Sequence, residues 1–178
     1  MLVNGLPGAG KSTLARAVAA ELSLPLLSKD VVKEQIGEHL PDDVATAHNG
    51  PTSPLGAGAT GALWSLLADV PTGAVLESWW PADVGPLVEA GLRRAGVDPA
   101  AVVEIWCDVP AALARERYGA RARHRIHGPQ VGLAWWNGPG PAAATPLGLG
   151  PVLRVDTSSP LTTRAVVDVS LRARALAI

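Results

Sequence analysis

Residues 5–13 of the sequence, GLPGAGKST, have the types and the spacing that bind the phosphates of a nucleotide. They fit the pattern G-x-x-x-x-G-K-[ST] without a mismatch. Glycines let the backbone curl so that N–H groups point at phosphate oxygens, and the helix that follows adds partial positive charge. The lysine of this pattern reaches the β- and γ-phosphates, and the hydroxyl is a Mg²⁺ ligand. A chance glycine-rich turn is the alternative, which the strand before and the helix after the motif disfavour. We therefore predict that ATP and Mg²⁺ are bound by Gly5, Leu6, Pro7, Gly8, Ala9, Gly10, Lys11, Ser12 and Thr13.

A carboxylate that could accept a proton follows the second predicted strand, at residues 24–28. Phosphoryl transfer to a hydroxyl requires a group that takes the hydroxyl proton. Asp30 stands at the carboxyl end of this strand, where open α/β sheets bind their ligands. We predict that Asp30 is this general base; the alternative is that it caps the helix that starts near Val31. Its neighbour Lys29 is predicted to be a solvated charge.

Five arginines stand within the eleven residues RERYGARARHR, in a chain whose formal net charge is only −1. Arg117, Arg121 and Arg125 are spaced i, i+4, i+8, so that on one helix they share a face. Folded over the nucleotide, this face would neutralise the charge that develops on the transferring phosphoryl group. The alternative is an exposed basic face without a function. Arg115 and Arg123 point elsewhere and are expected to be solvated or to pair with a carboxylate.

The sequence resembles the P-loop kinases, and within them the small ATP-dependent kinases related to polynucleotide 5′-kinase and chloramphenicol phosphotransferase. Three segments carry the resemblance: GLPGAGKSTLA, LSKDVVKE and CDVPAALARERYGAR. The resemblance implies that Asp30 is the general base and that Lys33, one turn further on, orients it. It also implies a lid helix in which Arg117 and Arg121 contact ATP.

Two further turns are predicted at the same edge of the sheet. The turn VDTSSP resembles the one that lies near the adenine base in these kinases, so Thr157 and Ser158 are candidates for the base pocket. An ordinary turn is the alternative. In AVLESWW, Glu77 and Ser78 stand where Walker-B-type sites have an aspartate for Mg²⁺. Glu77 is therefore a candidate metal residue, and the departure from aspartate leaves its role open.

Two pairs of tryptophans follow predicted elements: Trp79–Trp80 after the third strand, and Trp135–Trp136 after the arginine-rich helix and a connection rich in glycine and proline. We expect the first pair to lie nearer the acceptor, because a strand fixes its position. Trp79 and Trp80 come directly after a predicted strand, where they could wall off an acceptor and exclude water. Neighbouring residues of an extended segment face opposite ways, so at most one of the two should face the acceptor. The alternative is that these rings pack as core beneath the loops.

His124 and His127 lack an evident third ligand and are expected to be hydrated and not to bind a metal ion.

Strand and helix patterns alternate along the chain, which predicts a parallel sheet covered by helices on both faces. The strands are predicted at 1–4, 24–28, 73–78, 101–109 and 150–158. The helices are predicted at 12–23, 29–40, 58–70, 81–96, 110–125 and 162–177, with loops at 37–59 and 128–150. Together with the resemblance, this order predicts an α/β fold: one domain over 1–178, a P-loop NTPase three-layer sandwich with a five-stranded parallel sheet, nucleoside-kinase-like, with an arginine-rich lid at about 115–128.

Composition limits the classes of partner. The chain has 178 residues, of which 48% are hydrophobic, and 15 basic residues balance 16 acidic ones. This balance disfavours a surface for long nucleic acid. The single Cys107 cannot form an internal disulfide. No apolar run is long enough to span a bilayer and no signal peptide is seen, so a cytoplasmic location is expected. The oligomeric state is not predicted.

These patterns and the resemblance lead to an expected function. We expect an ATP-dependent kinase that phosphorylates a hydroxyl of a small acceptor, such as a natural product, antibiotic, sugar or nucleoside. Its acceptor contacts are expected from 37–59, 79–86 and 128–145. One alternative is a nucleotide-dependent switch or regulatory ATPase without a small acceptor. The other is a polynucleotide 5′-kinase-like enzyme, which the balanced charge disfavours.

Overall fold

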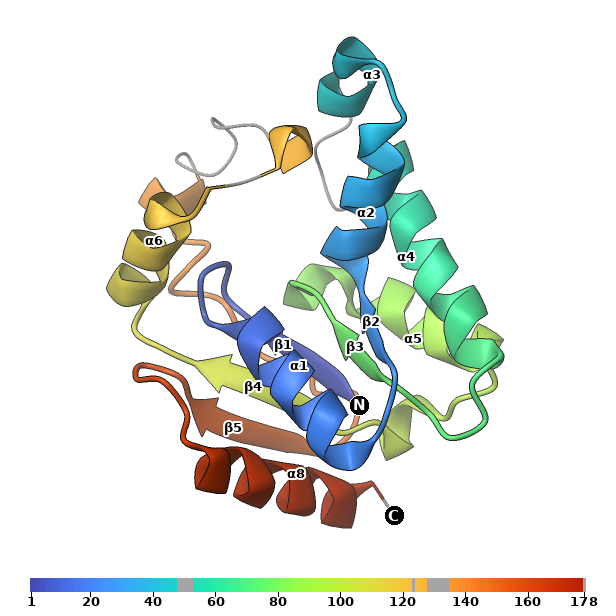
Figure 1. The fold of residues 1–178 in the computed structure, drawn as a ribbon, viewed down its shortest axis with the longest axis vertical. Helices are drawn as coiled ribbons and strands as arrows, with labels where there is room; N and C mark the ends of the chain where they lie inside the picture. The colour runs from blue at the N-terminus through green and yellow to red at the C-terminus, as the bar shows by residue number, and fades with distance from the viewer. Residues whose placement is uncertain (48–52, 123, 128–134, 178) are drawn as a thin grey trace.

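The structure is a computed structural model, which describes residues 1–47, 53–122, 124–127 and 135–177 (Figure 1). Its centre is one five-stranded sheet in the order β2-β3-β1-β4-β5, and all neighbouring strands are parallel. This confirms the predicted sheet. The strands are β1 (Leu2–Gly5), β2 (Leu26–Ser28), β3 (Val75–Glu77), β4 (Glu104–Asp108) and β5 (Val152–Asp156).

Helices connect the strands in the alternating order that the sequence predicts. The α-helices are α1 (Lys11–Leu22), α2 (Lys29–Glu38), α3 (Asp42–Ala47), α4 (Pro54–Ala68), α5 (Gly85–Arg94), α6 (Ala111–Ala120) and α8 (Thr163–Leu176). Short 3-10 helices are η1 (Ala82–Val84), η2 (Pro99–Ala101) and η3 (Arg125–His127).

The two faces of the sheet bury separate apolar clusters, because successive strand residues point to opposite faces. Leu2 packs in a cluster with Leu63 of α4 and with residues of α5. Val3 packs in another with Val18 of α1 and with residues of α8. The three layers are therefore α1 and α8, the sheet, and α4 and α5 (Figure 1). Within the described residues, no helix has the length and apolar character needed to cross a membrane.

Two helices depart from the prediction of a loop in the region 37–59. Residues 42–47 form α3, and α4 begins at Pro54, four residues before the predicted start. Ser53 caps α4, because its Oγ accepts a hydrogen bond of 3.0 Å from Gly56 N. Proline at the first helical position is compatible with this start, since the N–H that it lacks has no partner within a helix. Residues 48–52 lie outside the described part.

The predicted helix over 110–125 is wrong beyond Ala120, where α6 ends. Arg121 has an extended backbone, with φ −86° and ψ 128°. Gly119 weakens the last turn of the helix, and closely spaced arginines repel one another there. The five arginines therefore do not lie on one helix, and Arg123 lies outside the described residues.

Candidate active site

The glycine-rich loop joins β1 to α1 at the carboxyl edge of the sheet. Gly8 and Gly10 have positive φ angles of 84° and 83°, which glycine adopts without strain. Gly10 is the N-cap of α1, so the N-terminus of this helix points its N–H groups at the loop. Lys11 is buried, and its Nζ donates a hydrogen bond of 2.9 Å to Leu6 O. The lysine ammonium is thus held over the loop in which we expect the phosphates.

The loop is packed tightly from the side of α6. A Cβ atom at Gly8 would lie 2.1 Å from Ala114 O of α6, which is closer than any real contact. A Cβ at Gly5 would lie 2.8 Å from Cys107 O of β4. Both positions therefore require glycine for close approach as well as for conformation, and α6 lies directly against the loop.

Glu77 is placed beside the loop serine. It ends β3 and is only 3% exposed. Ser12 Oγ donates a hydrogen bond of 3.1 Å to Glu77 Oε1, and Ser28 Oγ donates one of 2.6 Å to Glu77 Oε2. A hydroxyl next to a carboxylate supplies the hard oxygen ligands that Mg²⁺ takes. Ser12 and Glu77 therefore fit the ion that the loop pattern implies.

Other protein ligands for an ion are not gathered in the described part of the chain. There, no group of three or more histidine, cysteine, aspartate or glutamate residues is placed to hold a metal ion. Mg²⁺ commonly binds through one or two protein groups, phosphate oxygens and water. The sparse donor set is thus compatible with an ion that arrives with a nucleotide.

Asp30 lies exposed in the first turn of α2, at the carboxyl end of β2. The N-cap of α2 is Ser28, so the alternative in which Asp30 caps a helix starting near Val31 does not hold. A negative charge in the first turn of a helix is stabilised by the helix dipole. The position leaves the carboxylate open to an acceptor, and its role as the general base stays a prediction.

Two lysines beside Asp30 are buried, so the prediction of a solvated Lys29 is wrong. Lys29 is 7% exposed and Lys33 is 6% exposed. Burial lowers the pKa of Lys29, the Asp30 carboxylate opposes this shift, and the charge of Lys33 adds to it. Lys29, Lys33 and Gly37 fall on one side of α2, and a Cβ at Gly37 would lie 2.6 Å from Ile126 Cδ1 of η3. This side of α2 therefore faces toward η3.

A cavity of about 420 Å³ lies on the other side of the loop, between α1 and the turn after β5. Its lining includes Gly10, Thr13, Arg117, Thr157 and Leu161. Arg117 Nη1 donates a hydrogen bond of 2.8 Å to Thr157 O, and Nη2 donates one of 2.5 Å to the Ser158 carbonyl. Arg117 and this turn thus form one wall of a cavity that opens beside the phosphate loop.

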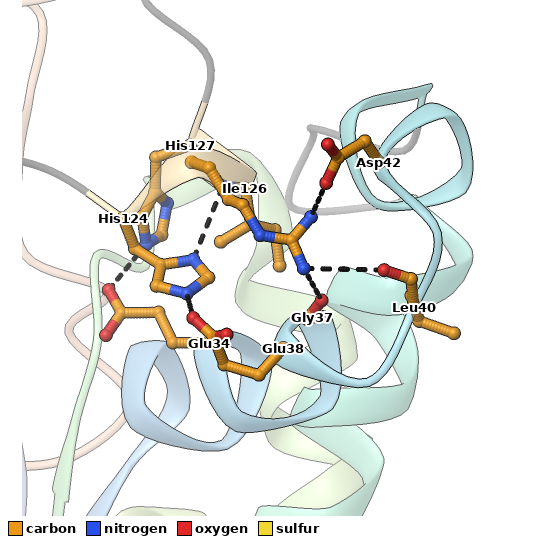
Figure 2. Close-up of polar contacts among 9 residues, drawn as sticks. Glu34, Gly37, Glu38, Leu40, Asp42, His124, Ile126 and His127 are labelled. Atoms are coloured by element: carbon orange, nitrogen blue, oxygen red, sulfur yellow. Dashed lines mark hydrogen bonds and ion pairs between the residues drawn. The ribbon is translucent and has the colours of Figure 1, made fainter.

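The three arginines predicted to share a face are separated. Arg117 is at the cavity, and Arg121 is exposed at the C-cap of α6. Arg125 donates hydrogen bonds to Gly37 O at 2.6 Å and to Leu40 O at 3.4 Å, and pairs with Asp42 (Figure 2). It therefore binds the carbonyl of Gly37 in the last turn of α2 and that of Leu40 just after the helix. The contacts of Arg121 and Arg117 with a phosphoryl group stay predictions.

His124 and His127, which the sequence predicts to be hydrated, pair with glutamates of α2, and their side chains are only 18% and 12% exposed. His127 Nε2 lies 2.8 Å from Glu34 Oε1, and His124 contacts Glu38 (Figure 2). The hydrogen bond and the charge of His124 lower the pKa of Glu38. Together with Arg125 and the buried Ile126, these contacts fasten the segment 124–127 to α2. We call this segment the strap.

The two tryptophans after β3 have different surroundings. Trp80 is 2% exposed and stacks on Trp64 of α4, with ring centroids 6.5 Å apart. Its ring therefore belongs to the core, and the prediction that Trp80 contacts the acceptor is wrong. Trp79 is half-buried and packs against Trp106 and Trp135, at centroid distances of 6.3 and 5.9 Å. An acceptor contact of Trp79 stays a prediction.

A buried polar network behind the loop was missed by the sequence reasoning. Asn4 Oδ1 accepts hydrogen bonds from Gly5 N at 2.8 Å and Trp80 N at 3.0 Å. Asn4 Nδ2 donates to Trp80 O and to Glu104 Oε1, at 2.9 Å each. Glu104 also accepts from the backbone N–H groups of Leu147 and Gly148, at 3.0 Å each. A polar residue inside an apolar strand was the available signal, because burial requires such a residue to be hydrogen-bonded.

Comparison with known proteins finds a matching family model, and solved structures of the same fold that are described as kinases. Residues 1–137 match the family model described as AAA domain. A Chloroflexus aurantiacus J-10-fl protein described as a "putative kinase" is 27% identical, with a TM-score of 0.74 and 97% of each chain covered. A sugar kinase from Janibacter sp. HTCC2649 is 20% identical, with a TM-score of 0.64 over 99% of this chain and 94% of that one. Shikimate kinase from Acinetobacter baumannii is 16% identical, with a TM-score of 0.59 over 98% and 90%. The last two show the shared fold alone, and no curated protein sequence matches the chain.

Proposed function

We propose that this chain, which belongs to the AAA domain family and has the fold of the P-loop kinases, transfers the γ-phosphoryl group of ATP to a hydroxyl of a small molecule. One observation carries the proposal. The phosphate loop with Lys11, the Ser12–Glu77 pair and the open Asp30 carboxylate stand at the carboxyl ends of the neighbouring strands β1, β3 and β2. Ligands of open α/β sheets bind at this edge.

The proposed roles follow from charge and position. Lys11 and the loop N–H groups bind the β- and γ-phosphates. Ser12 and Glu77 hold Mg²⁺, which when bound neutralises phosphate charge. Asp30 accepts the proton of the acceptor hydroxyl while the oxygen of that hydroxyl forms a bond to the γ-phosphorus. The bond from that phosphorus to the bridging oxygen breaks, and ADP leaves with this oxygen.

The cavity of about 420 Å³ is the proposed site of the adenine base. Thr157, Ser159 and Arg117 line this cavity, whereas Ser158, which the sequence predicts for the base pocket, does not. Arg117 would keep the turn in place through its contacts with the carbonyls of Thr157 and Ser158. The resemblance to kinases with a lid also supports contacts of Arg117 and Arg121 with ATP. In these roles both arginines act on the nucleotide and not on the acceptor.

The acceptor is proposed to bind between the start of α2 and the loop after β3, where Asp30, Lys33 and Trp79 are found. A natural product, an antibiotic, a sugar or a nucleoside has the small size and the hydroxyl that this proposal requires. The formal net charge of −1 gives no support to a polynucleotide acceptor.

ADP release from ATP, measured with and without a panel of small alcohols from these classes, tests the proposal. We expect turnover to rise on addition of at least one alcohol and a phosphomonoester of that alcohol to appear by mass spectrometry. Lys11→Ala is the control, since it removes the cation at the phosphates. Slow ADP release that no alcohol changes would instead favour a nucleotide-dependent switch or regulatory ATPase.

A further inference from the structure

Ser28 occupies a junction between the metal side and the acceptor side of the site. It is the last residue of β2 and the N-cap of α2, and it is 9% exposed. In the sheet it is the direct partner of Glu77 on β3. Lys29 and Asp30 follow it immediately in the chain. The side chain of Ser28 can therefore contact that of Glu77 directly across the two strands.

The hydroxyl of Ser28 does not make the contact that its position favours. A serine at an N-cap usually accepts a hydrogen bond from the backbone of the first turn, worth about 1 kcal/mol. Ser28 makes no such side-chain cap bond, and its Oγ donates to Glu77 Oε2 at 2.6 Å. This is the short distance of a hydroxyl bound to a carboxylate. A local rule that is broken in this way points to a function at the site.

The contact with Ser28 restricts a carboxylate that, in a glutamate, can move more than that of an aspartate. Compared with the aspartate of Walker-B-type sites, Glu77 has one more methylene and one more rotatable bond, so its carboxylate can occupy more positions. In the structure each oxygen is held by a different hydroxyl. Ser28 holds Oε2, and Oε1 then lies 3.1 Å from Ser12 Oγ.

We propose that Ser28 is a positioning residue, whose hydroxyl fixes the Glu77 carboxylate against Ser12 so that this pair takes up the Mg²⁺ of the bound nucleotide. The inference rests on the proposed function, because the ion arrives with ATP or ADP. It assigns to Ser28 a role in metal binding that is separate from helix capping and from contact with the acceptor.

The test measures metal affinity and not turnover. Mn²⁺ is titrated into the ADP-bound protein and free Mn²⁺ is followed by electron paramagnetic resonance. Ser28→Ala should weaken Mn²⁺ binding about tenfold, the effect typical of losing a partner that orients a metal ligand. Affinity for ADP without metal should not change. Ser28→Thr, which keeps the hydroxyl, should retain the affinity, and Ser28→Cys, a weaker donor, should lose it.

Ser78→Ala is the matched control, because Ser78 is buried next to Glu77 but its Oγ donates to Trp79 O. A double-mutant cycle adds a second readout: in the Glu77→Gln background, Ser28→Ala should cause no further loss. The inference is overturned if folded Ser28→Ala and Ser28→Cys bind Mn²⁺ as tightly as the wild type, or if Ser78→Ala is equally impaired. A wild-type protein that binds neither ADP nor ATP would refute the proposed function itself.

Discussion

Asp30 is the residue on which transfer should depend while nucleotide binding does not. It is exposed beyond the end of β2, and the N-cap position that could have explained an aspartate here is occupied by Ser28. Asp30→Asn keeps the shape and removes the base, so turnover with an acceptor should fall about 10²–10⁴-fold. ADP affinity by calorimetry should stay within about twofold, since no nucleotide contact is assigned to this carboxylate. Asp43→Asn, an exposed aspartate on α3, should change neither quantity. A collapse of ADP affinity in Asp30→Asn would instead assign Asp30 to the metal or to folding.

Cys107 provides a pH-dependent test of the interior beside the loop. Burial raises the pKa of its thiol to about 12, while the charge of Lys11 opposes this shift and that of Glu77 adds to it. The reactive thiolate is therefore scarce in the native protein until the pH approaches 12, whereas an unfolded cysteine ionises near pH 8.5. At pH 8, iodoacetamide should modify the native protein at least about 100-fold more slowly than the denatured protein, as measured by mass spectrometry. Since the chain has one cysteine, the signal has one source. Equal rates would mean that β4 opens readily next to the loop.

At the scale of single residues, the sequence was most informative where a motif has a strict spacing. Lys11 and Ser12 lie where the pattern predicts, because the loop conformation follows from local glycines. The burial of Lys29 and the Ser28–Glu77 bond depend on strands β2 and β3 being neighbours. A sequence does not specify such a pairing locally, so these contacts could not be derived from it.

Arg117 of α6 and Arg125 of the strap contact different parts of the fold. Arg117 contacts the turn at the proposed base cavity, and Arg125 contacts the end of α2. Arg117→Ala removes two hydrogen bonds to that turn, so affinities for ADP and ATP should fall together, by about tenfold. The arginine-finger prediction differs, because it expects turnover to fall more than ADP affinity. Calorimetry with ADP and steady-state kinetics on one preparation distinguish the two.

Two other arginines serve as controls for this variant. Arg115→Ala removes an exposed arginine of α6 and should leave ADP affinity unchanged. Arg125→Ala should also leave it unchanged, while amide hydrogen exchange in the strap becomes faster because its contacts to Gly37 and Leu40 are lost. Equal losses of ADP affinity in all three variants would show a diffuse charge effect and exclude a positioned Arg117.

The order of elements was predictable, whereas several of their ends were not. Hydrophobic periodicity identified the five strands and most helices, because each has one or two apolar faces that must be buried. The end of α6 at Ala120 was missed, because an i, i+4, i+8 spacing shows only that a face would form if the helix continued. The strap instead gains contacts with Glu34, Glu38 and Asp42, which are more than 80 residues away in the chain. Helix α3 was missed because the prediction treated the whole glycine- and proline-rich region 37–59 as loop.

Across the whole molecule, the buried Asn4–Glu104 network ties the phosphate loop to distant parts of the fold. Asn4 holds the first loop glycine and the backbone of Trp80, and Glu104 joins Asn4 to the backbone at 147 and 148. The network therefore connects β1, β4, the loop after β3 and the segment that leads to β5. Asn4 and Glu104 are buried and do not line the proposed base cavity, so we expect the network to affect stability more than chemistry.

Glu104→Gln tests this role of the network. Both carboxylate oxygens accept hydrogen bonds, Oε1 from Asn4 and Leu147 and Oε2 from Gly148. A glutamine keeps one oxygen and turns an NH₂ group toward an N–H, which leaves at least one donor of this part-buried network without its acceptor. The free energy of unfolding should therefore fall by about 1–3 kcal/mol. Denaturant unfolding followed by tryptophan fluorescence measures this change. Glu89→Gln, on the exposed face of α5 where Glu89 pairs with Arg93, should change the free energy by less than about 1 kcal/mol. If the two variants were equally stable, Glu104 would not connect these elements energetically, and the loop would have to owe its position to packing against α6 and β4 alone.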